Sequence, residues 1–366
     1  MSQRKLIFIT GASRSGTTLL SFVLRNHDEV FGLKELQYFG SAWDPRDRQR
    51  KFTRAQAIEA AASLFACQEF GILAPRVTDE HQRRAAALVD GLGEHGSDPA
   101  ELFAAAVNDL ARAAGKSIPC EQTPRYVFYA GALLDLYPGA QVVHLVRDPR
   151  AVMASQKKRW QRRSLARAGV NVPRWQSLRV WVNYHPFTVA RLWSRATRAA
   201  LALAKHPRVT ILKFEDLVRE PEPTVRRLCS RLGLSFDERM LDVGQINSSH
   251  QSSAAGARKG LHADTIDRWR EILTSTEIAV TQRYCADLMN RYGYDLEPVP
   301  APSLWDELRC RVSYALHALG VVLVNPRRAY VQARAVMRPR RPPSGPGMAF
   351  APPGCDEVGL QERHRG

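Results

Sequence analysis

The 366-residue chain lacks a membrane-spanning run, a paired cysteine motif and an N-terminal leader pattern. None of its hydrophobic stretches approaches the ~20 consecutive apolar residues that cross a bilayer. The apolar run Leu6–Thr10 is too short for a signal peptide and leads directly into a polar loop. Six scattered cysteines without a C-x-x-C pair predict reduced, mostly buried thiols rather than a disulfide or zinc framework. Together these absences predict a cytoplasmic, reducing location without an N-terminal membrane anchor.

Acidic residues are also missing from one long stretch. The chain carries 53 Lys and Arg against 36 Asp and Glu, a formal net charge of +17. Residues 149–214 contain no Asp or Glu, and they hold fifteen Lys and Arg. Such an excess attracts anions through its summed field, which favours ligand phosphates, an acidic acceptor or an anionic lipid surface as partners. A solvated basic helix is an equally good interpretation, and nucleic acid is not expected because no recognition motif for it is present.

The stretch Lys5–Leu20 (KLIFITGASRSGTTLL) carries the strongest local signal. Leu6–Ile9 is an apolar run typical of a buried strand, and apolar residues at helical spacing follow the loop. Between them, Gly11 and Gly16 bracket a loop that contains hydroxyl side chains and Arg14. A strand, a glycine-bracketed loop and a helix form a cradle whose backbone N–H groups point at an anion. The sequence therefore predicts a phosphate-binding loop.

This loop lacks the lysine of the nucleotide-triphosphate motif G-x-x-x-x-G-K-[ST]. Gly11 and Gly16 have the spacing of that motif, but Thr17 stands where the lysine would be, and the positive charge lies within the loop as Arg14. We therefore expect a phosphorylated donor other than ATP, with a P-loop kinase that uses ATP as the alternative. A turn without any ligand would explain the two glycines, but not the hydroxyls and the arginine beside them.

The segment R-S-G-T-T after a strand resembles the 5′-phosphosulfate loop of sulfotransferases, which use 3′-phosphoadenosine 5′-phosphosulfate. A second match, Val142–Ser155 (VVHLVRDPRAVMAS), resembles the 3′-phosphate site of that family, with Arg147 after a strand and Ser155 eight residues on. An ion pair of Arg147 with Asp148 is the alternative interpretation. The likeness is nearest to the bacterial and tyrosylprotein branches and covers residues 5–297, with 43–116 unassigned. It implies an α/β fold, a P-loop-like parallel sheet flanked by helices.

The resemblance implies a donor site assembled from several segments of the chain. It assigns donor contacts to Ser13, Arg14, Ser15, Gly16, Thr17, Thr18, Arg147, Ser155, Arg159, Phe214, Ser253 and Arg268. Phe214 stands where the family has a tyrosine near the adenine, although a core aromatic at the end of a strand is an equally good interpretation. The co-substrate is then 3′-phosphoadenosine 5′-phosphosulfate, and no metal is needed because arginines and backbone amides take the role of magnesium.

Glu35, in the segment G-L-K-E-L-Q, is the candidate general base. Sulfuryl transfer to a hydroxyl depends on positioning, on a base beside the attacking oxygen and on positive charge at the leaving phosphate. Glu35 follows a predicted strand over Glu29–Leu33, and parallel α/β sheets place their sites at strand C-terminal ends. The resemblance places the catalytic glutamate here, with Arg14 also in the catalytic site. If Glu35 is not the base, His27 or another pocket group is the next candidate. A carboxylate that caps a surface helix is the alternative.

Gln122, in Q-T-P-R-Y, departs from the family pattern, which usually reads K-T-P or K-D-P. In the family, that lysine touches the sulfate and its bridging oxygen, whereas glutamine donates a hydrogen bond without a charge. Lys34 and Arg125 are the candidates for replacing the missing charge. A catalytically weakened, donor-binding scaffold associated with a membrane is therefore a further alternative to an active enzyme.

The rest of the chain predicts a cap and a tail around this domain. Within a sulfotransferase-like α/β domain over 1–297, residues 44–116 predict a helical insertion that caps the acceptor pocket, with helices over Arg54–Phe70 and Ala100–Gly115 and a polar loop over Gly91–Pro99. Residues 298–337 predict an amphipathic helical extension, and 338–366 a disordered basic tail.

An apolar stripe over Leu304–Val324, followed by arginines, favours peripheral contact with the inner membrane surface. Docking of this helix on the main domain or on a dimer partner is favoured at least as much as membrane contact. The acceptor is expected to be a hydroxyl-bearing glycan, lipid, peptide or small molecule, either acidic or lipid-linked.

Overall fold

The computed structural model describes residues 5–71, 76–158, 182, 184–243, 261, 266–301 and 303–324. The chain divides into two units, Met1–Gly320 and Val321–Gly366. The predicted disordered tail over 338–366 and the arginines after residue 324 lie outside the described residues.

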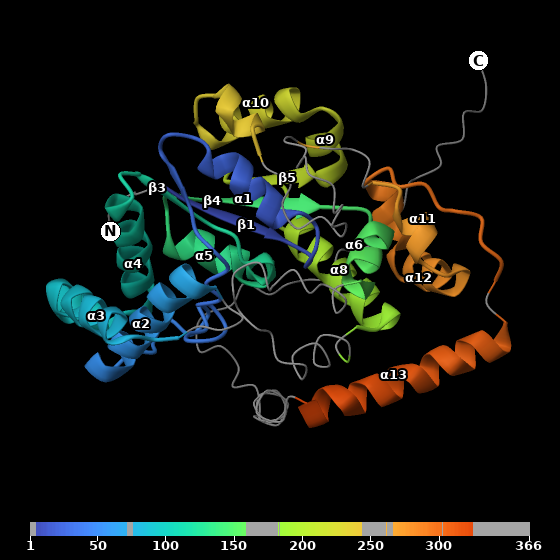
Figure 1. Cartoon of the computed structure of the whole chain (residues 1–366), viewed down its shortest axis with the longest axis horizontal. Coiled ribbons are helices and arrows are strands. Elements are labelled where there is room, and N and C mark those ends of the chain that lie inside the picture. Colours follow the sequence, from blue (N-terminus) through green and yellow to red (C-terminus); the bar gives the residue numbers. More distant parts are fainter. Residues whose placement is uncertain are drawn as a thin grey trace, which may run out of the picture. The chain divides into compact units, whose positions relative to one another are not determined.

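A five-stranded parallel sheet forms the centre of the first unit (Figure 1). Its strands are β1 (Leu6–Gly11), β2 (Val30–Gly32), β3 (Ile118–Glu121), β4 (Ala140–Val146) and β5 (Val209–Lys213), in the spatial order β2-β3-β1-β4-β5. All six residues of β1 are buried, and they pair with β4 from Leu6–Ala140 to Gly11–Leu145. Because every pairing is parallel, the C-terminal ends of the five strands lie along one edge. The predicted α/β class is confirmed.

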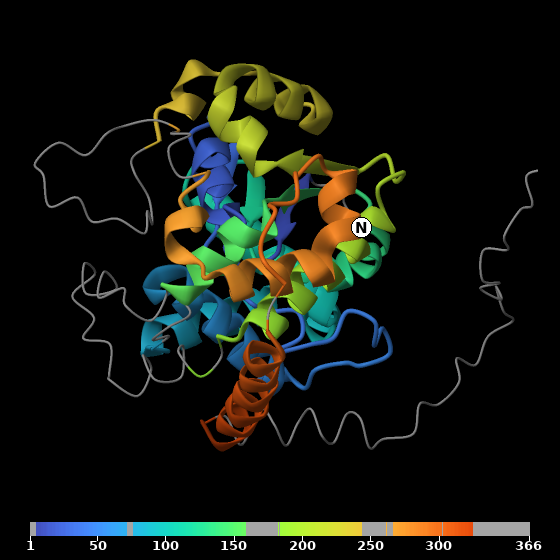
Figure 2. The same cartoon turned by 90° about the vertical axis from the view of Figure 1, so that its right-hand side faces the viewer.

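Helices cover both faces of the sheet (Figures 1 and 2). The described helices are α1 (Thr17–Arg25), α2 (Arg54–Phe70), α3 (Asp79–Leu92), α4 (Pro99–Ala113), α5 (Ala130–Leu136), α6 (Pro149–Lys157), α8 (Pro186–Leu201), α9 (Phe214–Arg219), α10 (Pro221–Leu232), α11 (Trp269–Ile272), α12 (Ser275–Arg291) and α13 (Leu304–Val324). Three short 3-10 helices lie at η1 (Gly93–Ser97), η2 (Pro124–Tyr129) and η5 (Glu238–Leu241).

The alternation of side chains along β1 explains why the core is divided between the two faces of the sheet. Successive side chains of a strand point to opposite faces, and accordingly Phe8 belongs to one core cluster while Ile7 and Ile9 belong to another. Phe8 packs in an aromatic group with Phe103 of α4 and Tyr126 of η2. The other cluster contains residues of α1, α9 and α10, which Figure 1 shows together on one side of the sheet.

The helices predicted between residues 44 and 116 can be compared with the structure one by one. Helix α2 spans the predicted Arg54–Phe70, and α4 begins at Pro99, where the Asp98 carboxylate accepts the N–H groups of Ala100 and Glu101. The polar loop predicted over Gly91–Pro99 is wrong, because the end of α3 and the helix η1 occupy it. Helix α3 escaped detection because its buried side consists only of His81, Ala85 and Val89, and its start is marked by a Thr78 cap rather than by a large apolar residue.

Two expectations about composition can be compared with the described residues. Cys67, Cys120, Cys229, Cys285 and Cys310 are free thiols, and three of them are buried, which confirms the prediction for this part of the chain. Across the described ranges, no helix combines the length and the apolar character that crossing a bilayer demands.

Candidate active site

The predicted site residues follow the C-terminal ends of all five strands. The phosphate loop follows β1, Glu35 follows β2, Gln122 follows β3, Arg147 follows β4, and Phe214 follows β5. Since these ends share one edge of the sheet, residues from distant parts of the sequence are gathered there, which is where open parallel sheets bind ligands.

The loop between β1 and α1 has the backbone of an anion nest. Arg14 has φ 78° and Gly16 has φ 100°, so two left-handed residues flank Ser15. The turn is closed by the Ser15 N–H, which donates to the carbonyl oxygen of Ala12 at 3.0 Å. Alternating conformations of this kind aim successive N–H groups into one concavity. A left-handed arginine is costly, and such strain is typical of functional loops.

The two predicted phosphate motifs meet in space. The Nε atom of Arg14 donates to the Oγ of Ser155 at 3.2 Å, across a sequence separation of 141 residues. The amide of Gln156 donates to the carbonyl oxygen of Ser13 at 3.3 Å, and the Nη1 of Arg147 to that of Arg14 at 3.4 Å. The first loop, the last turn of α6 and Arg147 before that helix therefore form one polar site rather than two.

Two features of the loop fit a phosphate group. Ser15 is fully buried, and its Oγ has no hydrogen-bond partner among the residues that the structure describes. Helix α1 starts after Gly16, which offers no side chain to cap its first N–H groups. A buried hydroxyl and the open N–H groups of a helix start require an acceptor, and phosphate oxygens supply one.

Phe214 and Arg147 close one side of the loop. The guanidinium carbon of Arg147 lies 4.1 Å from the centroid of the Phe214 ring. A Cβ atom added to Gly16 would lie 2.4 Å from Cδ2 of Phe214, so the ring packs directly on the loop backbone. Phe214 is thus both a buried core aromatic and a wall of the site.

Asp148 forms an ion pair with Arg150, whereas the alternative interpretation of the sequence paired Asp148 with Arg147. Arg150 Nη2 lies 2.7 Å from Asp148 Oδ2, and both side chains are almost fully buried. The Asp148 N–H donates to Glu215 at 3.0 Å, and burial raises the pKa of the Glu215 carboxyl. These bonds hold the start of α6 against the start of α9, directly after β5, and so fix the segment that carries Arg147.

Glu35 lies on the segment that joins β2 to the insertion and is partly exposed. Lys34 is directed elsewhere, because its Nζ donates to the carbonyl oxygen of Glu69 at the end of α2, at 2.5 Å. Arg125 Nη2 lies 3.4 Å from the carbonyl oxygen of Gly40. Gln122 is buried, and its Oε1 has no partner within the described part of the chain.

His27 does not belong to this edge of the sheet. It follows the C-terminal end of α1, a helix that starts at the phosphate loop and runs back across the sheet. Its ring lies 3.2 Å from the Oγ of Ser235 and accepts the N–H of Glu29 at 3.1 Å. The expectation that His27 is a candidate base is therefore wrong.

The remaining predicted donor residues are placed only in part. Arg268 precedes α11, which packs against α6, and the Nζ of Lys157 donates to the Ile272 carbonyl oxygen at 3.1 Å. Arg159 and Ser253 lie outside the described residues. In the described ranges, no group of three or more His, Cys, Asp or Glu is arranged to hold a metal ion.

Sequence reasoning missed two buried carboxylates at the strand ends, Glu121 and Glu215. Both accept backbone N–H groups from a neighbouring strand-end segment, Leu36 in the first case and Asp148 in the second. Their only sequence signal is an acidic residue directly at or after an apolar strand, which does not distinguish a buried carboxylate from an exposed one.

Comparisons with known proteins agree on one family. A family model described as the sulfotransferase family matches residues 7–238. Nodulation protein NoeE of Sinorhizobium fredii is 27% identical over 324 residues, covering 79% of this chain and 66% of that protein. Carbohydrate sulfotransferase 6 of Homo sapiens is 31% identical over 168 residues, covering 42% of this chain and 41% of that protein.

Among solved structures, the sulfotransferase domain from the Synechococcus PCC 7002 olefin synthase matches with a TM-score of 0.48 and 22% identity, over 81% of this chain and 98% of that one. The chain spans 66% and 41% of the lengths of the two relatives above.

Proposed function

The chain belongs to the sulfotransferase family, and from this membership we propose that it transfers a sulfuryl group from 3′-phosphoadenosine 5′-phosphosulfate to an acceptor hydroxyl. One observation carries the proposal most directly, the hydrogen bond of 3.2 Å between Arg14 and Ser155. It joins a loop suited to one phosphate to the last turn of α6, the helix that follows Arg147 and carries the second predicted phosphate motif. A donor with phosphates at both ends of its nucleoside requires two such sites side by side.

In this proposal the residues of the first loop hold the 5′-phosphosulfate. The backbone N–H groups from Ser13 to Thr18 and the buried Ser15 hydroxyl donate to its oxygens. Arg147 and Ser155 hold the 3′-phosphate, because a guanidinium binds phosphate through paired N–H donors. Phe214 borders the adenine, and Arg268, Arg159 and Ser253 complete the set.

Two residues act on the reaction itself. Glu35 takes the proton of the acceptor hydroxyl as the new sulfur–oxygen bond forms. Arg14 places positive charge beside the phosphate that leaves, and it is held there by Ser155. Gln122 contributes its amide N–H as a neutral donor where the family has a lysine. In this scheme arginines and backbone amides meet the donor's negative charge without a metal ion.

The experiment that tests the donor is titration calorimetry with nucleotides. 3′-Phosphoadenosine 5′-phosphate should bind at least ten times more tightly than AMP or ATP, because only it offers a 3′-phosphate to Arg147 and Ser155. Equal affinity for AMP would remove the roles of these two residues. Tighter binding of ATP with magnesium would favour the kinase alternative.

We propose that the acceptor is a hydroxyl of a carbohydrate or a lipid presented at a membrane. One matched relative is named a carbohydrate sulfotransferase. A screen of hydroxylated lipids, glycans and peptides with radiolabelled sulfate donor identifies the class, and turnover of soluble peptides alone would contradict this acceptor.

The membrane part of the proposal rests on α13, whose apolar side is exposed. Of the twelve exposed large hydrophobic side chains in the described residues, seven lie on this helix: Leu304, Trp305, Leu308, Val312, Leu316, Leu319 and Leu323. They are between 50% and 90% exposed, and their spacing places them on one face. The opposite face contacts the segment before α8, where the His185 ring lies 5.1 Å from that of Tyr314.

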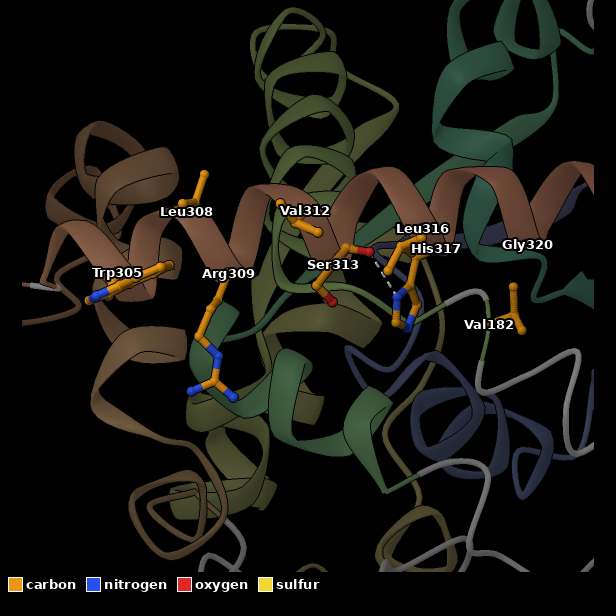
Figure 3. Close-up of a pocket in the computed structure, with 9 residues that line it drawn as sticks. All are labelled: Val182, Trp305, Leu308, Arg309, Val312, Ser313, Leu316, His317 and Gly320. Atoms are coloured by element: carbon orange, nitrogen blue, oxygen red, sulfur yellow. Dashed lines mark hydrogen bonds between the residues drawn. The ribbon is translucent and has the colours of Figure 1, made fainter.

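An anionic lipid surface suits this face better than a second copy of the chain. The chain carries a net charge of +17, so two copies repel each other while anionic lipid attracts both. Arg309 adds a positive charge beside the stripe, and it lines a groove of about 580 Å³ together with Val312 and Leu316 (Figure 3).

Vesicle flotation tests this surface. The protein should float with vesicles that contain anionic lipid and much less with neutral ones. Leu316→Glu should abolish flotation, because it places a charge in the stripe. Leu192→Glu is the matched control, since Leu192 is a similarly exposed leucine on α8. Equal loss in both variants, or none in Leu316→Glu, would contradict the proposed surface.

A further inference from the structure

A fully buried carboxyl group lies at the end of β3, directly beneath the segment that carries Glu35. Glu121 is the last residue of the strand and has no exposed surface. Its Oε1 accepts the N–H of Leu36 at 3.1 Å and also the hydroxyl of Thr123. Its Oε2 accepts the N–H of Thr123 at 2.9 Å. All of these partners belong to the two segments that leave β2 and β3.

These bonds fix the backbone on both sides of Glu35. On the near side, the N–H of Leu33 donates to the carbonyl oxygen of Cys120 at 2.8 Å. On the far side, the N–H of Leu36 reaches Glu121, and that of Gln37 donates to the hydroxyl of Thr123 at 3.3 Å. Gln37 has φ 50°, a left-handed conformation that a non-glycine residue adopts only when its surroundings enforce it.

Keeping a carboxyl group at this place is costly for the fold. Burial raises the pKa of Glu121 to about 8, and the nearby negative charge of Glu35 acts in the same direction. A buried polar group is tolerated when its hydrogen bonds are made, and here three donors converge on the two oxygens. A strand end needs no carboxylate to terminate, so the arrangement points to the segment that it holds.

We propose that Glu121 is a positioning residue for the reaction, which acts by holding the Leu33–Gln37 segment so that Glu35 meets the acceptor hydroxyl. This inference rests on the proposed role of Glu35 as the base. Glu121 itself touches neither donor nor acceptor in this scheme. Thr123 extends this hydrogen-bond network, since its hydroxyl donates to Glu121 and accepts the N–H of Gln37.

The physical reason is the sensitivity of proton transfer to geometry. A base works only within hydrogen-bond reach of the proton that it takes, and a displacement of about 1 Å costs on the order of 10²-fold in rate. Glu35 is partly exposed and stands on a connecting segment rather than inside a helix or strand. The carboxyl group below therefore supplies the rigidity that regular secondary structure would otherwise give.

The test is a double-mutant cycle between Glu121 and Glu35. Glu121→Gln keeps the shape but replaces one accepting oxygen with an amide that faces an N–H donor. Its turnover should fall by roughly 10- to 100-fold, as for other residues that orient a reacting group. Affinity for 3′-phosphoadenosine 5′-phosphate should change by less than about twofold, because the donor residues lie on the first loop and α6.

The second arm of the cycle separates positioning from a general structural role. In a Glu35→Gln background, adding Glu121→Gln should lower turnover by less than about threefold, because the base that Glu121 positions is already absent. A full 10- to 100-fold loss in both backgrounds would overturn the inference. Unchanged turnover in the Glu121→Gln single variant would also overturn it.

Thr123 gives an independent test if Glu121→Gln folds poorly. Thr123→Ser keeps the hydroxyl that joins Glu121 to Gln37, and its turnover should stay within about twofold of the parent protein. Thr123→Val removes the hydroxyl at nearly constant volume, and its turnover should fall as in Glu121→Gln with donor affinity retained. Equal turnover of the Ser and Val variants would refute the proposed linkage. Normal turnover of Glu35→Gln would instead refute the base assignment, while donor binding would still support the proposed transferase.

Discussion

Replacing Gly16 by alanine should damage both stability and donor binding, for two separable reasons. Gly16 has φ 100°, where an alanine costs about 1–2 kcal/mol. Its new Cβ would lie 2.4 Å from the Phe214 ring, and overpacking of this kind costs about 1–3 kcal/mol. The smaller entropy of the unfolded alanine chain returns about 0.4–1 kcal/mol. We expect a net loss of roughly 2–4 kcal/mol in the free energy of unfolding.

Two other glycines serve as matched controls. Gly293 has φ 68° but open space around its Cβ position, so Gly293→Ala carries the backbone strain without the clash and should lose about 1 kcal/mol. Gly91 lies within α3 with ordinary φ and open space, so Gly91→Ala should gain about 0.5–1 kcal/mol. Urea denaturation of the three variants measures these free energies directly.

Donor affinity gives the second readout of the Gly16 change. The displaced Phe214 ring carries the Arg147 guanidinium on its face, so both groups should move. Calorimetry should show a loss of at least tenfold in affinity for 3′-phosphoadenosine 5′-phosphate, with normal affinity in Gly293→Ala. If Gly16→Ala loses no more stability than Gly293→Ala and binds the donor normally, the packing of Phe214 on the loop does not shape the site.

Four further changes test the remaining residues. Glu35→Gln should lower turnover by ~10²–10⁴-fold with donor affinity retained, and near-normal turnover would place the base elsewhere. Arg147→Ala should lose on the order of 2–5 kcal/mol of affinity for 3′-phosphoadenosine 5′-phosphate but little for AMP, and a parallel loss for AMP would contradict the assignment. Because burial raises the pKa of Glu121 to about 8, the folded protein keeps a proton that the unfolded chain releases, so stability should fall as pH rises toward 8. Burial lowers the pKa of His185 to about 4, so His185 reduces stability only as the pH falls below its ordinary pKa of 6.5. Between pH 6.5 and 8, the free energy of unfolding should therefore fall less in Glu121→Gln than in the parent protein. If the parent protein turns over slowly, Gln122→Lys should raise the rate, and no change would show that the missing charge is not limiting.

The elements of the fold were largely predictable from local patterns. Strand β1 is a short apolar run before a glycine, and the apolar spacing of α2 and α13 predicted their bounds. These signals are local because burial of one face imposes a period on the chain. Helix α3 was not predictable in this way, since its buried residues, His81, Ala85 and Val89, are too few to stand out as an apolar face.

The sequence predicts the candidate site as separate motifs, but it does not predict the contacts between them. The sequence placed Arg14 and Ser155 in separate phosphate sites, and only the parallel order of β1 and β4 brings them within hydrogen-bond distance. It also did not reveal that Glu121 is buried, because an acidic residue at a strand end has the same sequence signature whether covered or exposed. The direction of Lys34 toward Glu69 depends on the packing of α2, which no local pattern encodes.

The central place of β1 has a consequence for synthesis of the protein on the ribosome. Strand β1 emerges before both of its neighbours, β3 and β4, which are made more than a hundred residues later. At ~5–20 residues per second, the 141 residues between Arg14 and Ser155 take roughly 7–30 s to translate. Throughout that interval the nascent chain carries an apolar strand without its neighbours, which is the kind of surface that chaperones bind. With the proposed donor site, Arg14 and Ser155 are both present only after α6 has been made, so donor binding would not assist the folding of β1 before that point.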